Sequence, residues 1–222
     1  MRALVNTCPQ LRQRRARLAR RACNDDAPCS RNGAVNPSST RVLVLFATGF
    51  EEIETITIVD VLRRADLEVV TASPTGGLIT GSHAIAIESE RRFAELAARD
   101  FAAVVLPGGM QNARTLSTDR EAQRLIREAR DLDRVVGAIC AAPIALRAAK
   151  AIRGARITSH PGVASELAGE RYGEERVVCD GKLITSRGPG TALEFALALV
   201  ALLCGPEHAA AVAAPMVLPP RA

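Results

Sequence analysis

A cysteine stands at the junction between a strand-like and a helix-like segment. Residues 134–139 are mostly apolar and rich in β-branched side chains, which is typical of a buried strand, and Pro143 opens a helical segment at residues 143–149. Cys140 therefore falls at a sharp strand-to-helix turn, a geometry that exposes a nucleophile at the carboxyl edge of an α/β sheet. The N-terminus of that helix would favour the thiolate. We predict a reactive cysteine; the alternative is a small buried hydrophobic residue.

Three acidic side chains follow the first predicted strand, residues 42–47. Glu51, Glu52 and Glu54 fall in the first turn of a predicted helix. Because ligand sites of parallel sheets lie beyond the carboxyl ends of the strands, a carboxyl here can meet Cys140 and take part in acid–base chemistry. Acidic residues in a first turn also stabilise the helix dipole without any chemistry, so both interpretations stay open at this point.

Two further strand ends carry residues suited to chemistry. Gly108 and Gly109 follow the strand at residues 101–106, and a glycine pair can present backbone N–H groups to an anion. His160 follows the strand at residues 155–159 and would add an imidazole. Together the strand ends supply what a cysteine-based site needs, namely a nucleophile, a carboxyl, an oxyanion cradle and an imidazole. A plain turn and a half-buried histidine are the alternatives.

The order of elements predicts an α/β fold. Strand-like and helix-like segments alternate, which favours a mostly parallel sheet with helices on both faces and right-handed crossovers. An Asp180-Gly181 turn between two strand-like runs predicts a small β-hairpin. The predicted strands are residues 42–47, 67–72, 84–87, 101–106, 134–139, 155–159, 176–179 and 182–185, and the predicted helices are residues 51–65, 93–98, 119–132, 143–149, 191–203 and 206–213.

Composition narrows the class of protein. The 222 residues suffice for one domain, and 48% hydrophobic with 24% charged residues is ordinary for a globular protein. The net charge of +5 comes from residues 1–40, where eight arginines and two aspartates give +6, so residues 41–222 carry −1. With no tryptophan and one tyrosine, specific nucleic-acid binding is not expected. No apolar run is long enough to cross a membrane.

The chain divides at about residue 40. Residues 1–40 are predicted to be a basic, disordered extension, with a transit peptide or a mis-assigned start as alternatives, and residues 41–222 form the α/β domain. The six cysteines include no pair with CxxC spacing. We expect reduced thiols, which suit a cytoplasmic protein.

Five short motifs are spaced along residues 41 to roughly 218. They are Glu51-Glu52-Ile53-Glu54-Thr55, Val104-Val105-Leu106-Pro107-Gly108-Gly109, Ala138-Ile139-Cys140-Ala141-Ala142-Pro143, Thr158-Ser159-His160-Pro161 and Thr185-Ser186-Arg187-Gly188-Pro189-Gly190-Thr191. In this order they resemble the ThiJ/PfpI superfamily, and most closely its branch containing the parkinsonism-associated protein deglycase and its bacterial relatives. Five motifs in the family's order are strong evidence, although each alone is moderate.

The resemblance implies a flavodoxin-like sandwich and a homodimer. The site residues that it implies are catalytic Cys140, Glu54 and His160, with Gly108, Gly109 and Ala141 binding the substrate or its oxyanion. Because a carboxyl and a thiolate held close are like charges, we expect one of the two groups to keep its proton. Glu54 would then be protonated and would donate to the sulfur, and the pKa of the cysteine would be lowered.

Three residues are predicted at the periphery of the site and the dimer: Glu51, His83 and Pro189. In well-known members of the branch, an arginine pairs across the dimer with the acid that matches Glu51. His83 stands at the arginine's position in this chain. A neutral imidazole would weaken such a pair above its titration range.

The sequence thus predicts a cysteine-dependent glyoxalase or deglycase with a stress-protective role. Its substrates would be methylglyoxal-type dicarbonyls or their early protein or nucleotide adducts, and it would need no metal or organic cofactor. The alternative is a non-enzymatic oxidation sensor or redox-regulated chaperone that uses the same cysteine. A cysteine peptidase is disfavoured, because Ala141 stands where the protease-like branch typically has histidine.

Overall fold

The computed structural model describes residues 40–218, so the predicted extension at residues 1–40 lies outside the described residues except for its last position. The strands are β1 (Arg41–Leu45), β2 (Glu68–Ser73), β3 (Gly77–Thr80), β4 (Ala86–Ser89), β5 (Arg91–Arg92), β6 (Ala103–Leu106), β7 (Val135–Ile139), β8 (Arg156–Ile157), β9 (Arg171–Tyr172), β10 (Val177–Asp180) and β11 (Leu183–Ser186). The α-helices are α2 (Glu52–Arg64), α3 (Met110–Thr118), α4 (Arg120–Asp131), α5 (Pro143–Ala148), α6 (Ala192–Cys204) and α7 (Pro206–Ala213).

One seven-stranded sheet organises the chain, in the order β10-β11-β7-β6-β1-β2-β5. The pairings from β2 through β1, β6 and β7 to β11 are all parallel, and β10 pairs antiparallel with β11. The parallel strands follow the flavodoxin-like order. The chain adds β2 on one side of β1 and then adds β6, β7 and β11 on the other side. The predicted α/β sandwich with a mostly parallel sheet and a small hairpin is therefore confirmed.

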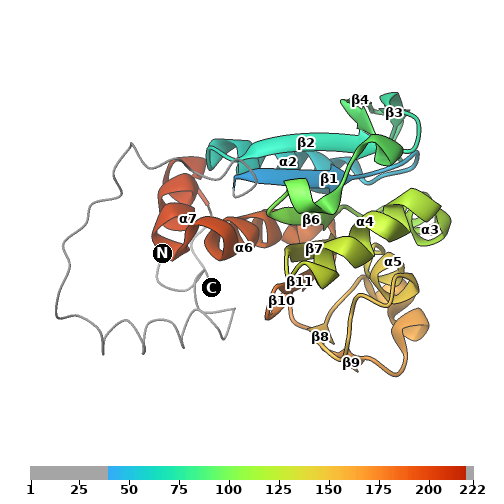
Figure 1. Ribbon diagram of the computed structural model, residues 1–222. Helices are drawn as coiled ribbons and strands as arrows, with labels where there is room; N and C mark the ends of the chain where they lie inside the picture. Colours follow the sequence, from blue (N-terminus) through green and yellow to red (C-terminus); the bar gives the residue numbers. More distant parts are fainter. Residues whose placement is uncertain (1–39, 219–222) are drawn as a thin grey trace.

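Helices cover both faces of the sheet (Figure 1). Helices α2 and α6 pack together on one face, and α3, α4 and α5 pack together on the other. Because both faces are covered, the central strands are apolar throughout: β1 from Val42 to Leu45 and the whole of β6 are fully buried. This arrangement places the ends of β1, β6 and β7 at one edge, with the starts of α2, α3 and α5 beside them.

Some local predictions are wrong. Residues 93–98 do not form an α-helix but two short 3₁₀ turns, Phe93–Glu95 and Ala98–Asp100. Helix α3 and strand β3 were not predicted, because a polar helix and a strand of only four residues give weak periodic signals. Among the described residues, no helix is both long and apolar enough to cross a membrane.

Candidate active site

Cys140 occupies a strained turn immediately after β7. Its backbone φ is +62°, a left-handed conformation that residues with a side chain rarely adopt. Two hydrogen bonds hold the turn: the Cys140 N–H donates to the Ser186 carbonyl at 2.9 Å, and the Cys140 carbonyl accepts from the His160 N–H at 2.8 Å. Strain of this kind persists only where neighbouring structure fixes it, and it gathers at functional sites. The predicted strand-to-helix elbow is present.

Backbone N–H groups surround the sulfur of Cys140. The N–H groups of Gly109 and Ala141 both hydrogen-bond to it. Gly109 precedes α3 with φ +92°, and a Cβ there would lie 2.2 Å from the Gly49 carbonyl oxygen. Only glycine fits at this position, so the close approach of this loop to the backbone of residues 49–51 depends on it. We call the N–H groups of Gly109 and Ala141 the oxyanion cradle.

Glu54 reaches the same place from the first turn of α2. Its side chain is fully buried, and its Oε2 accepts a hydrogen bond from the Gly108 N–H at 2.7 Å. A Cβ on Gly108 would lie 2.5 Å from the Cβ of Cys140 and 2.6 Å from Oε2 of Glu54. The missing side chain of Gly108 therefore leaves the space in which the thiol and the carboxyl meet.

Burial dominates the electrostatics of this pair. Desolvation raises the pKa of Glu54 to about 8, although the N–H of Gly108 opposes the rise. Desolvation and the neighbouring carboxylate raise the pKa of Cys140 to about 12, against the two N–H groups of the cradle. The pair therefore loses one proton near pH 8 and keeps the second to much higher pH. Protonation of Glu54 at neutral pH agrees with the prediction, whereas the low pKa predicted for the thiol is wrong, because the sulfur is buried beside a carboxyl.

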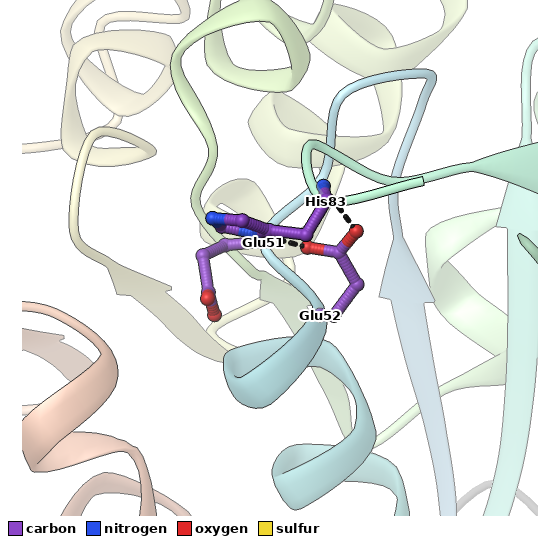
Figure 2. Close-up of side chains that lie close together, drawn as sticks. All are labelled: Glu51, Glu52 and His83. Carbon is purple, nitrogen blue, oxygen red and sulfur yellow. Dashed lines mark hydrogen bonds and ion pairs between the residues drawn. The ribbon is translucent and has the colours of Figure 1, made fainter. Parts of the chain in front are cut away.

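The neighbouring acids have different structural roles. Glu51 caps α2: its Oε2 accepts from the Glu54 N–H at 2.7 Å, while its own N–H donates to the Gly108 carbonyl. Glu52 points instead to the β3–β4 hairpin, where it accepts from Ser82 Oγ at 3.1 Å and pairs with His83 Nδ1 at 2.9 Å (Figure 2). Within its own chain His83 is thus paired with Glu52, and a pair with Glu51 across a dimer stays a prediction.

In the His83–Glu52 pair the Glu52 side chain is buried and the His83 side chain is exposed. The pKa of Glu52 is lowered to about 2, because hydrogen bonds from His83 and Ser82 outweigh the desolvation that raises it. The hydrogen bond to Glu52 and the charge of Glu52 raise the pKa of His83. One potential ligand atom each from Glu51, Glu52 and His83 lies within 4.8 Å of the others. We assign no metal to them: the Glu51 carboxylate already accepts from the Glu54 N–H as the cap of α2, and the helix N-terminus disfavours a cation.

The backbone N–H of His160 contacts the elbow by donating to the Cys140 carbonyl. Its side chain is exposed, and Nδ1 accepts from the Gly162 N–H at 3.0 Å, which caps the 3₁₀ segment Pro161–Leu167. The ring also faces the loop that carries Pro189, since a Cβ on Gly188 would lie 3.6 Å from His160 Cδ2. Because Nδ1 already accepts a hydrogen bond from the Gly162 N–H, this nitrogen is not available as a base toward the sulfur. A catalytic role for His160 stays a prediction.

One buried polar residue at this edge was not predicted. Asn112, in the first turn of α3, is fully buried and bonds through its amide to the loops that end β1 and β6. The sequence offers one signal for it, a polar amide three residues after the Gly108-Gly109 pair. That signal has no meaning until α3 itself is placed.

Fold and site together define a class: flavodoxin-like α/β proteins with a cysteine on a strained elbow and a carboxyl beside it. The sequence model of the DJ-1/PfpI family matches residues 40–202, and the chain belongs to this family. The resemblance inferred from the motifs is thereby confirmed.

Individual relatives are similar over most of the chain. The Parkinson disease protein 7 homolog of Danio rerio is 39% identical over 80% of this chain and 97% of its own length. The Deglycase PYRAB04690 of Pyrococcus abyssi is 34% identical over 73% of this chain and 99% of its own. The crystal structure of Drosophila melanogaster DJ-1beta matches with a TM-score of 0.78 and 36% identity, over 82% of this chain and 99% of that one.

Proposed function

We propose that the protein is a cysteine-dependent glyoxalase or deglycase that acts on methylglyoxal-type dicarbonyls or their early adducts and has a stress-protective role. The observation that carries the proposal is the Cys140 sulfur held between the oxyanion cradle and the buried carboxyl of Glu54. Similarity to the deglycase of Pyrococcus abyssi supports the same chemistry. No metal or organic cofactor is needed, because water is the only co-reactant.

The reactive form is the tautomer of the singly ionised pair in which the thiol proton has moved to Glu54 and the charge lies on sulfur. The tautomer with the charge on Glu54 is the more populated one, because the pKa of Glu54 lies below that of Cys140. The thiolate attacks the aldehyde carbon of the dicarbonyl, and the carbonyl electron pair becomes an oxyanion that the N–H groups of Gly109 and Ala141 stabilise. Protonation of this oxygen by Glu54 gives a hemithioacetal and leaves the Glu54 carboxylate as a base. A carboxylate that has just lost its proton inside a buried site is a strong base for the next step.

The remaining steps need no external oxidant or reductant. Glu54 removes the hydrogen on the former aldehyde carbon as a proton, and an enediol forms with the neighbouring carbonyl. Protonation of the second carbon leaves a thioester on Cys140, so the first carbon is oxidised and the second reduced. Water then adds to the thioester, the C–S bond breaks, and a hydroxy acid is released with the thiolate restored. The overall reaction adds one water.

Two substitutions test the proposal. We expect purified Cys140→Ser and Glu54→Gln proteins to convert methylglyoxal to lactate at least a hundredfold more slowly than the unmodified chain, since each lacks a reacting group. Cys179→Ser is the matched control, because Cys179 is a buried cysteine on β10 outside the elbow. Circular dichroism confirms folding. Lactate formation by folded Cys140→Ser at the unmodified rate would refute the proposal.

Free dicarbonyl and adduct can be separated kinetically. Methylglyoxal is combined with N-acetylarginine, the adduct is isolated, and its disappearance is followed with and without protein. If the protein accelerates the loss beyond the spontaneous release rate, the adduct is a substrate. If the loss never exceeds that rate while lactate accumulates, the substrate is free methylglyoxal.

Oxidation sensing is the second candidate. The cradle that would hold an oxyanion can equally donate hydrogen bonds to the oxygens of a sulfinate on Cys140. A similar structure is that of Toxoplasma gondii DJ-1 in oxidised form. Mild peroxide followed by peptide mass spectrometry should place two oxygens on Cys140. Sensing would lead if the oxidised protein gains aggregation-suppressing activity and the reduced protein shows no dicarbonyl turnover.

A homodimer is proposed through α2 and the β3–β4 hairpin. The four exposed apolar side chains on this face are Ile53, Ile56, Leu78 and Ile85, each at least 48% exposed, and the His83–Glu52 pair joins the two elements. Exposed apolar side chains gathered on one face mark an interaction surface. We expect Ile53→Glu to halve the mass measured by light scattering and Leu132→Glu, at the end of α4, to leave it unchanged.

Location and domain limits complete the proposal. Cys140 and Cys204 are free thiols, which suits the reducing, cytoplasmic compartment that we propose. We propose that residues 41–222 fold as one unit and that residues 1–40 are an extension. A protein that begins at residue 41 should then keep the thermal stability and the turnover of the full chain.

A further inference from the structure

Asn112 is a fully buried amide to which the chemistry above gives no role. Its Oδ1 accepts from the Ala47 N–H at 2.7 Å, and its Nδ2 donates to the Pro107 carbonyl at 2.8 Å and the Gly108 carbonyl at 3.0 Å. Both N–H donors and the acceptor oxygen of the amide therefore have partners, as a buried amide requires. Asn112 links the loop after β1 to the two consecutive peptides after β6.

Those two peptides carry the N–H groups that contact the reactive pair. A trans peptide is planar, and its C=O and N–H point in opposite directions. The Pro107 carbonyl shares a peptide with the Gly108 N–H, which donates to Glu54 at 2.7 Å. The Gly108 carbonyl shares the next peptide with the Gly109 N–H, which bonds to the Cys140 sulfur. When the two carbonyls are held on one side of the loop, the two N–H groups therefore point to the opposite side, toward Glu54 and the Cys140 sulfur.

We infer that Asn112 is a positioning residue of the thiol site. Its single amide group sets the planes of both peptides, so that one N–H reaches the carboxyl and the next reaches the sulfur. The inference rests on the Cys140–Glu54 chemistry proposed above and adds a residue that touches neither reacting group.

The loop needs such a restraint because glycine supplies none of its own. Gly108 and Gly109 lack the side chain that limits φ and ψ in other residues, so their peptides can rotate at little steric cost. The Glu51 N–H also holds the Gly108 carbonyl, at 3.0 Å. For the Pro107 carbonyl, Asn112 is the partner that the structure gives. By accepting from the Ala47 N–H, the same side chain also ties the loop to the end of β1 and hence to the sheet.

The test is the pH dependence of Cys140 alkylation by iodoacetamide, followed at this one residue by peptide mass spectrometry. Both N–H groups favour the charged form of the pair. In Asn112→Ala we therefore expect the profile to move to higher pH and alkylation at pH 7 to fall roughly three- to tenfold. Asn112→Ser is measured in parallel in case the alanine variant does not fold. Glu51, the other charge acting on Glu54, is unchanged in both variants.

Gln123→Ala is the matched control. Gln123 is also a buried amide, and its Nε2 donates to the Leu116 and Ala145 carbonyls at 2.8 and 3.1 Å, away from the two peptides. We expect it to lower the melting temperature without moving the alkylation profile. If the Asn112 variants also lower only the melting temperature, the inference is overturned. Alkylation needs no dicarbonyl, so a protein without turnover would refute the proposed function and still decide the role of Asn112.

Discussion

Replacing Glu54 with glutamine should make the protein more stable as the pH rises. Glu54 is fully buried, and burial raises its pKa from the ordinary 4.5 to about 8. Between these values the folded protein keeps a proton that the unfolded chain has released. Folded molecules then bind more protons than unfolded ones, so the free energy of unfolding falls as the pH rises through this range. Glutamine has no proton to lose, and the variant lacks this pH-dependent cost.

The size of the effect follows from the two pKa values. One pKa unit corresponds to about 1.4 kcal/mol, so the cost of burying Glu54 grows by about 3 kcal/mol between pH 5 and pH 8. Glutamine can still accept from the Gly108 N–H, but its NH₂ group replaces an oxygen, Oε1, that has no hydrogen-bond partner among the described residues. The unpaired NH₂ donor would lower the free energy of unfolding of the variant by about 1–3 kcal/mol at every pH. The change with pH is therefore the diagnostic quantity, not the stability at one pH.

Urea unfolding of both proteins at half-unit steps from pH 5 to pH 8 measures this difference. We expect the stability of Glu54→Gln relative to the unmodified chain to rise steadily, by an amount equivalent to roughly 10 °C in melting temperature. Glu88→Gln is the control, because Glu88 is exposed on β4 and its difference should stay flat. A difference that is equally flat for Glu54→Gln would refute the claim that Glu54 is protonated at neutral pH.

Two further predictions concern the edges of the site. Gly108→Ala should slow Cys140 alkylation more than tenfold, because the new Cβ would lie 2.5 Å from the Cβ of Cys140 and 2.6 Å from Glu54 Oε2; an unchanged rate in a folded variant would contradict the packing described. Glu52→Gln should move the NMR titration of His83 down toward the ordinary 6.5, since the hydrogen bond and charge of Glu52 raise the pKa of His83. The pair's contribution to stability is full between the ordinary pKa values of Glu52, 4.5, and His83, 6.5, and is lost as the pH rises through the folded pKa of His83, so Glu52→Gln should destabilise less at high pH.

The sequence predicted the sheet well because its central strands are buried on both faces. Continuous apolar runs such as residues 42–45 and 103–106 have one physical explanation in a chain of this length, and their spacing leaves room for the crossover helices. Helix α3 cannot be predicted from an apolar pattern in the same way. It is short and polar, and Asn112 in its first turn acts through a side-chain amide that binds backbone groups of other loops, which no motif reveals.

The proximity of the candidate residues was predicted, but the electrostatics of the site was not. Strand ends brought Cys140, the three glutamates and the glycine pair to one edge, and the family resemblance selected Glu54; the structure places Cys140, Glu54 and Gly108 in contact, and their chemical roles stay predictions. The pKa of the thiol depends on how deeply the sulfur is buried, which a sequence does not give. The partner of His83 could not be chosen either: Glu51 and Glu52 are adjacent, and only the turn of α2 decides which carboxylate faces the hairpin.

The features that would make this site reactive are also the ones that cost stability. Cys140 has a left-handed backbone, and Glu54 is buried with one oxygen unpartnered among the described residues. Each is unfavourable alone, and each is held by contacts from elements beyond its own: Ser186 and His160 on the elbow, Gly108 on the carboxyl, and Asn112 on the peptides between them. Substitutions at the costly positions should therefore raise stability while removing reactivity, whereas substitutions at the holding positions should lower both. Measuring stability from pH 5 to pH 8 together with methylglyoxal turnover in Glu54→Gln and Asn112→Ala separates the two classes. Turnover should fall in both, while stability relative to the unmodified chain should rise with pH in Glu54→Gln and stay lower in Asn112→Ala.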